Sequence, residues 1–295
     1  MNQVTPALIY AYFDTCHTPL LADAAGQDPP PAASAAARTH LWQYWGQGAE
    51  AAPPLIRVCL ASVCRHCGDC EIHVLDDHTL HEYVTIPPHI LQHLQNGSMS
   101  QAHFSDYLRT CLLLQYGGIW LDATVYLSGP LPAAVREAAF FIYKSPLFHS
   151  FASLPPFVSR PHLSPPPGTA FPPPYLLCGS SWCIAAACGC RLPLLLRRLL
   201  EAYWQRNNRL LDYFLFHYLM TWLLYRDRGC AELFLSMPSL SNIPPHLMQA
   251  QLPRPYNPQL DAAIRAATSV HKLTYKLETA PGATGLTLHH LLCGA

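Results

Sequence analysis

Residues 112–131 read LLLQYGGIWLDATVYLSGPL, and this stretch contains the turn on which the fold depends. An apolar helix is expected to end near Gln115. Gly117 then stands where a left-handed helix cap is wanted, and Gly118 allows a tight turn into a short buried strand. That strand ends at Asp122. Because only 12% of the chain is charged, a carboxylate at the end of so apolar a strand is a candidate functional residue.

The composition of the chain limits the classes of protein to which it can belong. Its 295 residues are 51% apolar, which suits one large α/β domain or a domain with a smaller subdomain. Eighteen basic residues balance eighteen acidic ones. The electrostatic footprint of a nucleic-acid binder, or of a polybasic membrane anchor, is therefore missing, and we expect no nucleic-acid partner.

Hydrophobic segments and cysteines give expectations about the cellular compartment. The first fifteen residues have no basic start and no cleavage site, so no signal peptide is expected. The most apolar segments, 176–190 and 210–225, are shorter than the roughly 20 residues that cross a bilayer. Twelve cysteines without an export signal indicate reduced thiols. A cytoplasmic protein without a transmembrane segment is predicted.

The pattern along the chain predicts a flexible leader followed by one domain. Residues 22–39 are rich in Pro and Ala and have little to bury, so we expect residues 1–39 to be a flexible leader and 40–295 the folded domain. From His40 onward, strand-like and helix-like segments alternate. This alternation is typical of an α/β fold with a mostly parallel central sheet flanked by helices.

Several elements can be placed by local signals. Ser100 is a good N-cap for a helix that runs to Gln115. The remaining expected elements are strands at 71–75, 138–143 and 180–187, helices at 192–206 and 211–226, and a proline-rich surface loop at 154–175.

Asp106 and Arg109 are three residues apart on the helix before the glycines, so they share a face away from its apolar stripe. A helix that returns directly into the Asp122 strand can bring this face to the same end of the sheet, where α/β proteins bind ligands. A pocket shared by the three residues is predicted. The alternatives are a simple surface ion pair, and an Asp122 that caps a turn.

Five segments together resemble a known family. They are WQYWGQG (42–48), SDYLR (105–109), LLLQYGGIWLDATV (112–125), LLDYFLFHYL (210–219) and HKLTYK (271–276). In this order and spacing they resemble the capsular polysaccharide synthesis family of glycosyltransferases, over roughly residues 40–277. That family is similar to the wider group of GT-A-type sugar transferases, which carry an aspartate-any-aspartate motif after YGG.

The resemblance implies a fold, an activity and a setting. The fold would be a GT-A-like nucleotide-sugar-binding α/β fold. The activity would be transfer of a sugar, with retention of configuration in the wider group, from a nucleotide-sugar donor to a hydroxyl of a glycan or lipid-linked glycan. The setting would be capsular or surface polysaccharide biosynthesis, in the cytoplasm or peripherally associated with the inner face of the cell membrane.

The resemblance also implies roles for individual residues. Gln43 and Trp45 would lie beside the nucleotide base, on which the tryptophan could stack. Asp106 and Arg109 would hold the ribose and phosphate region, and Asp122 would be the first aspartate of the metal motif.

The second aspartate of the motif is missing. Thr124 stands in its place, and a hydroxyl is a much weaker ligand for Mn²⁺ or Mg²⁺ than a carboxylate. Asp122, Thr124 and His217 would be the metal ligands, and Asp122, Arg109 and Asp212 would be the catalytic residues. Asp212 or His217 could compensate for the loss, or Arg109 could neutralise the leaving diphosphate directly. A buried histidine without function is the alternative for His217.

Two other interpretations remain open. Cys64, Cys67 and Cys70 have the C-x-x-C spacing of zinc ligands, but no second pair follows, and a cysteine cluster without function is the alternative. Because Thr124 departs from the metal motif, the chain could also be a non-catalytic carbohydrate- or partner-binding module that retains the glycosyltransferase fold.

Overall fold

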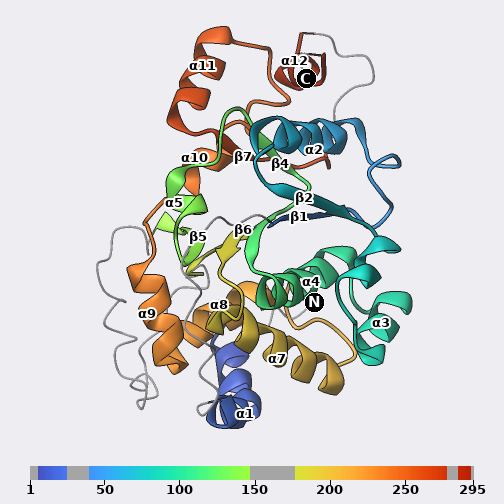
Figure 1. Cartoon of the computed structure of the whole chain (residues 1–295), viewed down its shortest axis with the longest axis vertical. Helices are drawn as coiled ribbons and strands as arrows, with labels where there is room; N and C mark the ends of the chain where they lie inside the picture. Colours follow the sequence, from blue (N-terminus) through green and yellow to red (C-terminus); the bar gives the residue numbers. More distant parts are fainter. Residues whose placement is uncertain (1–5, 25–39, 147–176, 278–284, 294–295) are drawn as a thin grey trace.

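The computed structural model describes residues 6–24, 40–146, 177–277 and 285–293 (Figure 1). The predicted proline-rich loop and most of the Pro- and Ala-rich segment 22–39 lie outside these residues. Within them, no helix combines the length and the apolar character needed to cross a bilayer.

A five-stranded sheet forms the centre of the molecule. Its strand order is β2 (Glu71–Leu75), β1 (His40–Tyr44), β3 (Gly118–Leu121), β6 (Gly179–Ala186) and β5 (Phe140–Lys144). The first three strands are parallel, and β6 runs antiparallel to both of its neighbours. Four strands therefore share one direction, which confirms the predicted mostly parallel sheet of an α/β protein.

A small second sheet lies beside the end of β3. Its strands β4 (Val125–Leu127) and β7 (Val270–Lys272) pair antiparallel, with Val125 opposite Lys272. The backbone N–H of Leu273 also donates to the carbonyl of Thr124 at 3.0 Å. This pairing brings a late part of the chain next to the residues that follow Asp122.

Helices cover both faces of the central sheet (Figure 1). One face is covered by α3 (Pro88–Gln95), α4 (Gln101–Gln115), α7 (Arg191–Arg206) and α8 (Leu215–Arg226), whose apolar side chains form the largest core cluster. The other face lies against α2 (Pro54–His66) and the small sheet. The shorter elements are η1 (Thr79–Glu82), α5 (Ala133–Arg136), α9 (Arg228–Ser236), α10 (Ile243–His246), α11 (Pro258–Ala267) and α12 (Thr287–Cys293).

The predicted flexible leader contains a folded segment. Residues Pro6–Ala24 form helix α1, which packs on α7 and α8. Ile9, Tyr10 and Phe13 are buried in the largest core cluster. Asp14 accepts hydrogen bonds from the side chains of Trp222 and Arg226, each at 2.8 Å. The expectation of a flexible leader is therefore wrong for this helix, because its aromatic residues have partners that the local composition did not reveal.

The turn between α4 and β3 has the predicted form. The Oγ of Ser100 accepts the backbone N–H of His103 at the start of α4, at 3.4 Å. Gly117 and Gly118 have φ values of 69° and 99°. A Cβ on Gly118 would lie 2.3 Å from the carbonyl oxygen of His40. Both the left-handed backbone and the close approach of β1 therefore require glycine, and α4 passes directly into β3.

Candidate active site

The end of β3 fixes the position of Asp122. Its backbone N–H donates to the carbonyl of Trp182 at 2.9 Å, and its own carbonyl accepts the N–H of Val125 at 2.9 Å. Trp120 lies two residues earlier on the same face of the strand. Its indole Nε1–H donates to Asp122 Oδ1 at 2.9 Å. The carboxylate is therefore held in one orientation at the carboxyl edge of the sheet.

Helix α4 brings Asp106 and Arg109 to this edge, as predicted. Arg109 Nη2 lies 3.2 Å from Asp106 Oδ1 and 3.2 Å from Asp122 Oδ1. The expectation that the polar face of the helix meets the end of the strand is confirmed. The direct turn at the two glycines produces this meeting, because it fixes how α4 lies against β3.

Arg109 is buried beneath Asp122. The residue is 2% exposed, and its guanidinium lies 4.9 Å from the centre of the Trp120 ring. Nε and Nη1 donate to the carbonyls of Ser105 and Ser181, at 3.0 and 2.5 Å. Its donors are thus used inside the protein. In this arrangement Arg109 orients Asp122 and does not reach a substrate.

Lys272 completes the site, and sequence reasoning missed it. Its Nζ lies 2.8 Å from Asp122 Oδ2 and also donates to Thr124 Oγ1. The side chains of Lys272 and Asp122 are 21% and 24% exposed, so a substrate can reach both. Lys272 belongs to the segment 271–276 that carried part of the family resemblance. That membership was the available signal, but the pairing of β4 with β7 could not be read from the sequence.

The two carboxyl groups of the site have opposite electrostatic surroundings. Burial alone would raise the pKa of Asp122, but the charges of Lys272 and Arg109 outweigh it and hold this pKa well below its ordinary range. Burial raises the pKa of Asp106 to about 7, with Arg109 opposing the shift and Asp122 adding to it. The site therefore contains two cations, one firmly ionised carboxylate and one carboxyl group that titrates near neutrality.

The residues at Asp122 do not fit a divalent cation as they are arranged. Both carboxylate oxygens are already engaged, Oδ1 by Trp120 and Arg109 and Oδ2 by Lys272. Lys272 also engages the hydroxyl of Thr124. Its ammonium group thus lies between the two side chains that were expected to be metal ligands. A metal ion here would have to displace a protein cation that the fold itself supplies.

His217 lies on α8 near Arg109 and Asp122. Burial, together with the smaller effect of the charge of Arg109, lowers its pKa to about 4, while Asp122 opposes the shift. Its Nδ1 is buried, and no partner for it is found among the described residues. No contact with Asp122 or Thr124 is described, so the predicted three-residue metal set is not brought together in the described part of the chain.

Asp212 is not on a helix, in contrast to the predicted helix at 211–226. It lies in the turn before α8, where its Oδ1 accepts the backbone N–H of Phe214 at 2.8 Å. This bond starts a turn and delays the helix to Leu215. Within the described residues Asp212 has no contact with Asp122 or Arg109, which leaves no geometric support for the catalytic role that was expected.

Gln43 and Trp45 lie at the carboxyl end of β1, but they differ in access. Gln43 is fully buried, and neither polar atom of its side chain has a partner among the described residues. Trp45 is half-buried and packs beside a small cluster that contains Ala123. Tyr275 meets it edge to face at 5.2 Å. Trp45 and Tyr275 therefore present aromatic surface near Asp122, whereas Gln43 has no direct access to solvent.

The zinc site considered for the three cysteines does not form among the described residues. Cys64 is exposed, Cys70 is half-buried and Cys67 is buried in the core. Burial raises the pKa of Cys67 to about 12, which disfavours the thiolate that zinc requires. Among the described residues, the side chains that lie close enough together to hold a metal ion are two histidines and a glutamate elsewhere in the fold, and no cysteine is among them. Asp76 caps the start of η1, where its Oδ1 accepts the backbone N–H of Thr79 at 2.8 Å.

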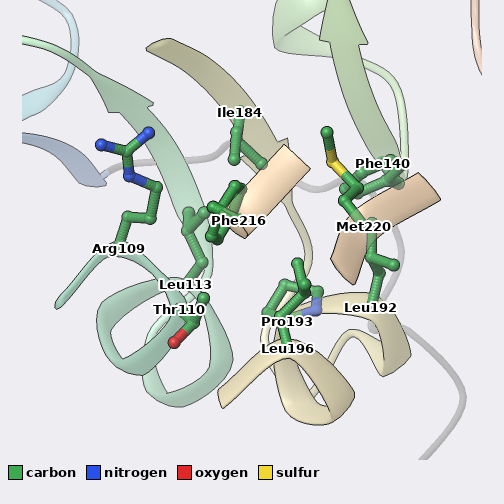
Figure 2. A pocket seen from close by; sticks show the side chains of 10 residues that line it. All are labelled: Arg109, Thr110, Leu113, Phe140, Ile184, Leu192, Pro193, Leu196, Phe216 and Met220. Atoms are coloured by element: carbon green, nitrogen blue, oxygen red, sulfur yellow. The ribbon is translucent and has the colours of Figure 1, made fainter. Parts of the chain in front are cut away.

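A small cavity lies on the buried side of Arg109, between α4, α7 and α8 (Figure 2). Apart from Arg109 and Thr110, its lining is apolar, with side chains such as Leu113, Ile184 and Phe216. Its volume of about 10 Å³ is close to that of one water-sized probe. The cavity is a gap in the core packing and is too small for a sugar nucleotide, so the site to consider is the exposed side of Asp122 and Lys272.

Comparisons with known proteins confirm the family resemblance. The model of a family described as capsular polysaccharide synthesis protein matches residues 26–291. Among solved structures, one titled "PaToxG Glycosyltransferase" is similar at 15% sequence identity, with 90% of each chain covered and a TM-score of 0.36. That likeness is too distant to support an argument. No curated protein matches the chain.

Proposed function

The chain belongs to the capsular polysaccharide synthesis protein family, and from this membership we propose that it is a glycosyltransferase. It moves a sugar from a nucleotide-sugar donor to a hydroxyl of a glycan or lipid-linked glycan acceptor, in capsular or surface polysaccharide biosynthesis. The single observation that carries the proposal is the ion pair of Asp122 with Lys272, partly exposed at the carboxyl edge of a mostly parallel sheet. Ligands of α/β proteins bind at this edge.

The chemistry of sugar transfer explains why a cation is needed there. Breaking the bond between the sugar and the diphosphate builds negative charge on the leaving phosphate, which a fixed positive charge stabilises. An ammonium group has three N–H donors, and the bonds of Lys272 to Asp122 and Thr124 use two of them. The third can donate to a phosphate oxygen. Lys272 is therefore our candidate for the group that stabilises the departing diphosphate.

The buried residues hold this lysine in place. Asp122 fixes the ammonium group at 2.8 Å, and Arg109 and Trp120 in turn fix Asp122 through its other oxygen. Such preorganisation means that the charge does not have to reorient when the sugar is transferred. Asp122 and Arg109 are thus positioning residues in this proposal. Asp106, with its raised pKa, sets how much negative charge lies beside Arg109.

The aromatic surface next to the charged group suggests where the donor base binds. Trp45 follows β1, and Tyr275 follows β7, only three residues after Lys272. A base stacked on Trp45 would place its diphosphate toward Asp122 and Lys272, as expected for a GT-A-like nucleotide-sugar-binding fold. Gln43 is buried beneath this surface, and its side-chain amide has no partner among the described residues. It could hydrogen-bond to the base only if Trp45 or Tyr275 moves.

A protein cation takes the place of the expected metal ion. A Mn²⁺ or Mg²⁺ ion would neutralise the leaving diphosphate, and Lys272 supplies positive charge at the same place without two carboxylates. The loss of the second aspartate at Thr124 is then compensated, because a hydroxyl is a good acceptor for an ammonium group. Transfer without a divalent metal is therefore expected.

The test is a panel of nucleotide sugars assayed for a thermal shift and for release of the nucleoside diphosphate, with and without a chelator. We expect one donor class to bind and to be hydrolysed slowly without acceptor. Asp122→Asn should abolish the release, whereas Asp212→Asn, a matched carboxylate outside the site, should retain it. A protein that neither binds nor hydrolyses any donor would instead be the non-catalytic binding module. Equal activity of the two variants would remove Asp122 from the mechanism.

A further inference from the structure

Two histidines and a glutamate meet at the opposite, amino edge of the central sheet. His40 is the first residue of β1 and Glu71 the first residue of β2, and the two are paired in the parallel register. His73 follows two residues after Glu71 and projects from the same face of β2. The group lies at the other end of these strands from Asp122, and the sugar-transfer proposal does not use it.

The donor atoms of the three side chains converge. His40 Nδ1 lies 3.1 Å from His73 Nε2. The carboxylate of Glu71 approaches both rings, with Oε2 3.4 Å from His40 Nδ1 and Oε1 3.5 Å from His73 Nε2. Tetrahedral zinc bonds of about 2.0–2.1 Å place neighbouring ligand atoms about 3.3–3.4 Å apart. The contact between the two rings is close to this edge length, and one ligand atom from each of the three residues lies within 4.8 Å of the others, so a small adjustment of the exposed glutamate would complete three corners of a tetrahedral site.

The rings are held in this orientation by the residues around them. His73 stacks on the indole of Trp42 with 4.2 Å between ring centres, and its other nitrogen, Nδ1, lies 3.2 Å from the hydroxyl of Tyr83. His40 also stacks on Trp42, at 5.3 Å. A hydrogen-bond partner on the second ring nitrogen is the usual support for a metal-binding histidine, because it fixes the tautomer and directs the lone pair.

A simple hydrogen-bonded cluster explains the contacts less completely. A hydrogen bond between the rings accounts for the 3.1 Å contact of His40 with His73. It does not require a carboxylate at nearly equal distances from both ring nitrogens. The side chain of Glu71 is 62% exposed, so an ion pair there would contribute little to stability. A cation shared by the three groups would account for the approach of the carboxylate to both rings.

We propose that His40, Glu71 and His73 bind one divalent transition-metal ion, of which Zn²⁺ is the representative. Two imidazoles and one carboxylate suit zinc and its neighbours rather than Mg²⁺ or Ca²⁺, which prefer oxygen ligands. The exposure of Glu71 leaves the fourth position open to water or another ligand. The bound ion would tie the edge strand β2 to β1.

The direct test is calorimetric titration of Zn²⁺ into the full chain, with three variants beside it. Glu71→Gln and His40→Ala each remove one ligand from a partly exposed position, and His81→Ala, an exposed histidine of η1, is the matched control. The first two variants should raise the Kd of the tightest Zn²⁺ site by more than ~10–100-fold, which is the usual cost of losing a residue that only hydrogen-bonds to a metal ligand. The control should bind like the wild type. Unchanged binding in all variants would overturn the proposal.

The twelve cysteines could bind zinc by themselves, so a second measurement identifies the ligands. Co²⁺ in place of Zn²⁺ should give the visible absorption of a tetrahedral nitrogen and oxygen site, and this absorption should disappear in Glu71→Gln. A strong near-ultraviolet thiolate charge-transfer band that survives in Glu71→Gln would assign the metal to cysteine and refute the site. With Zn²⁺ at 100 times its Kd, the melting temperature should rise by about 4 °C in the wild type and in His81→Ala, but not in the two ligand variants.

Discussion

Replacing Lys272 with methionine removes one charge from the site and keeps a side chain of similar length. A phosphate charge about 4 Å from an ammonium group gains about 4 kcal/mol at an effective dielectric constant of about 20. Each ~1.4 kcal/mol corresponds to a tenfold change in rate. Because Lys272 is 21% exposed, solvent screens part of this energy. We therefore expect Lys272→Met to lower kcat by about 100- to 1,000-fold, similar to the loss of one oxyanion donor.

The assay is release of the nucleoside diphosphate from the donor that the panel identifies, with kcat and KM determined separately. The charge on the leaving group develops during the reaction, so kcat should fall more than KM rises. Lys276→Met is the matched control, because Lys276 is an exposed lysine four residues further along the same segment. A thermal melt of each variant shows whether the protein is still folded.

Two results would rule out a role for Lys272 in stabilising the leaving group. The first is a folded Lys272→Met protein with the kcat of the wild type, since the ammonium group would then contribute nothing to the reaction. The second is a wild-type activity that a chelator abolishes and Mn²⁺ restores. In that case a metal ion, and not the lysine, would stabilise the leaving diphosphate.

Two further predictions concern stability. Burial raises the pKa of Asp106 from 3.8 to about 7. Between these two pH values, Asp106 keeps its proton in the native state, whereas the unfolded chain has released it. Asp106 therefore makes the free energy of unfolding fall as pH rises. The melting temperature of Asp106→Asn relative to the wild type should therefore rise from pH 4 to pH 7, and a constant difference would contradict this. Gly118→Ala should cost at least about 2 kcal/mol in urea unfolding, because φ is 99° and the new Cβ would lie 2.3 Å from the His40 carbonyl oxygen. Gly97→Ala, with φ of 76° but nothing within 4 Å, should cost only about 1 kcal/mol, and equal losses would show that close packing at Gly118 is not the cause.

The parts of the fold that local rules control could be predicted from the sequence. Ser100 caps α4, the two glycines have left-handed backbones, and the strand ends at Leu121, directly before Asp122 and within one residue of the expected end. The meeting of Arg109 with Asp122 was also predictable, because a short turn leaves a helix and the following strand few ways to pack. These features depend on residues fewer than twenty positions apart.

The features that sequence reasoning missed depend on distant pairings. Lys272 reaches Asp122 from 150 residues away, through the register of β4 with β7. His40, Glu71 and His73 converge only because β1 and β2 pair in parallel with His40 opposite Glu71. The expectation for Asp212 was wrong for a local reason. Its side chain accepts a hydrogen bond from the backbone N–H of Phe214, and α8 begins only after this turn. Neither the register of distant strands nor a hydrogen bond that competes with the first turn of a helix produces a periodic pattern in the sequence.

Helix α1 has a consequence for how the protein is made. Asp14 is bonded to Trp222, 208 residues later in the chain. At a ribosomal rate of about 5–20 residues per second, about 10–40 s pass before these partners emerge. During that interval Ile9, Tyr10 and Phe13 have no core to enter and are open to chaperones or to other nascent chains. Helix α1 therefore cannot dock until α8, synthesised long after it, has emerged.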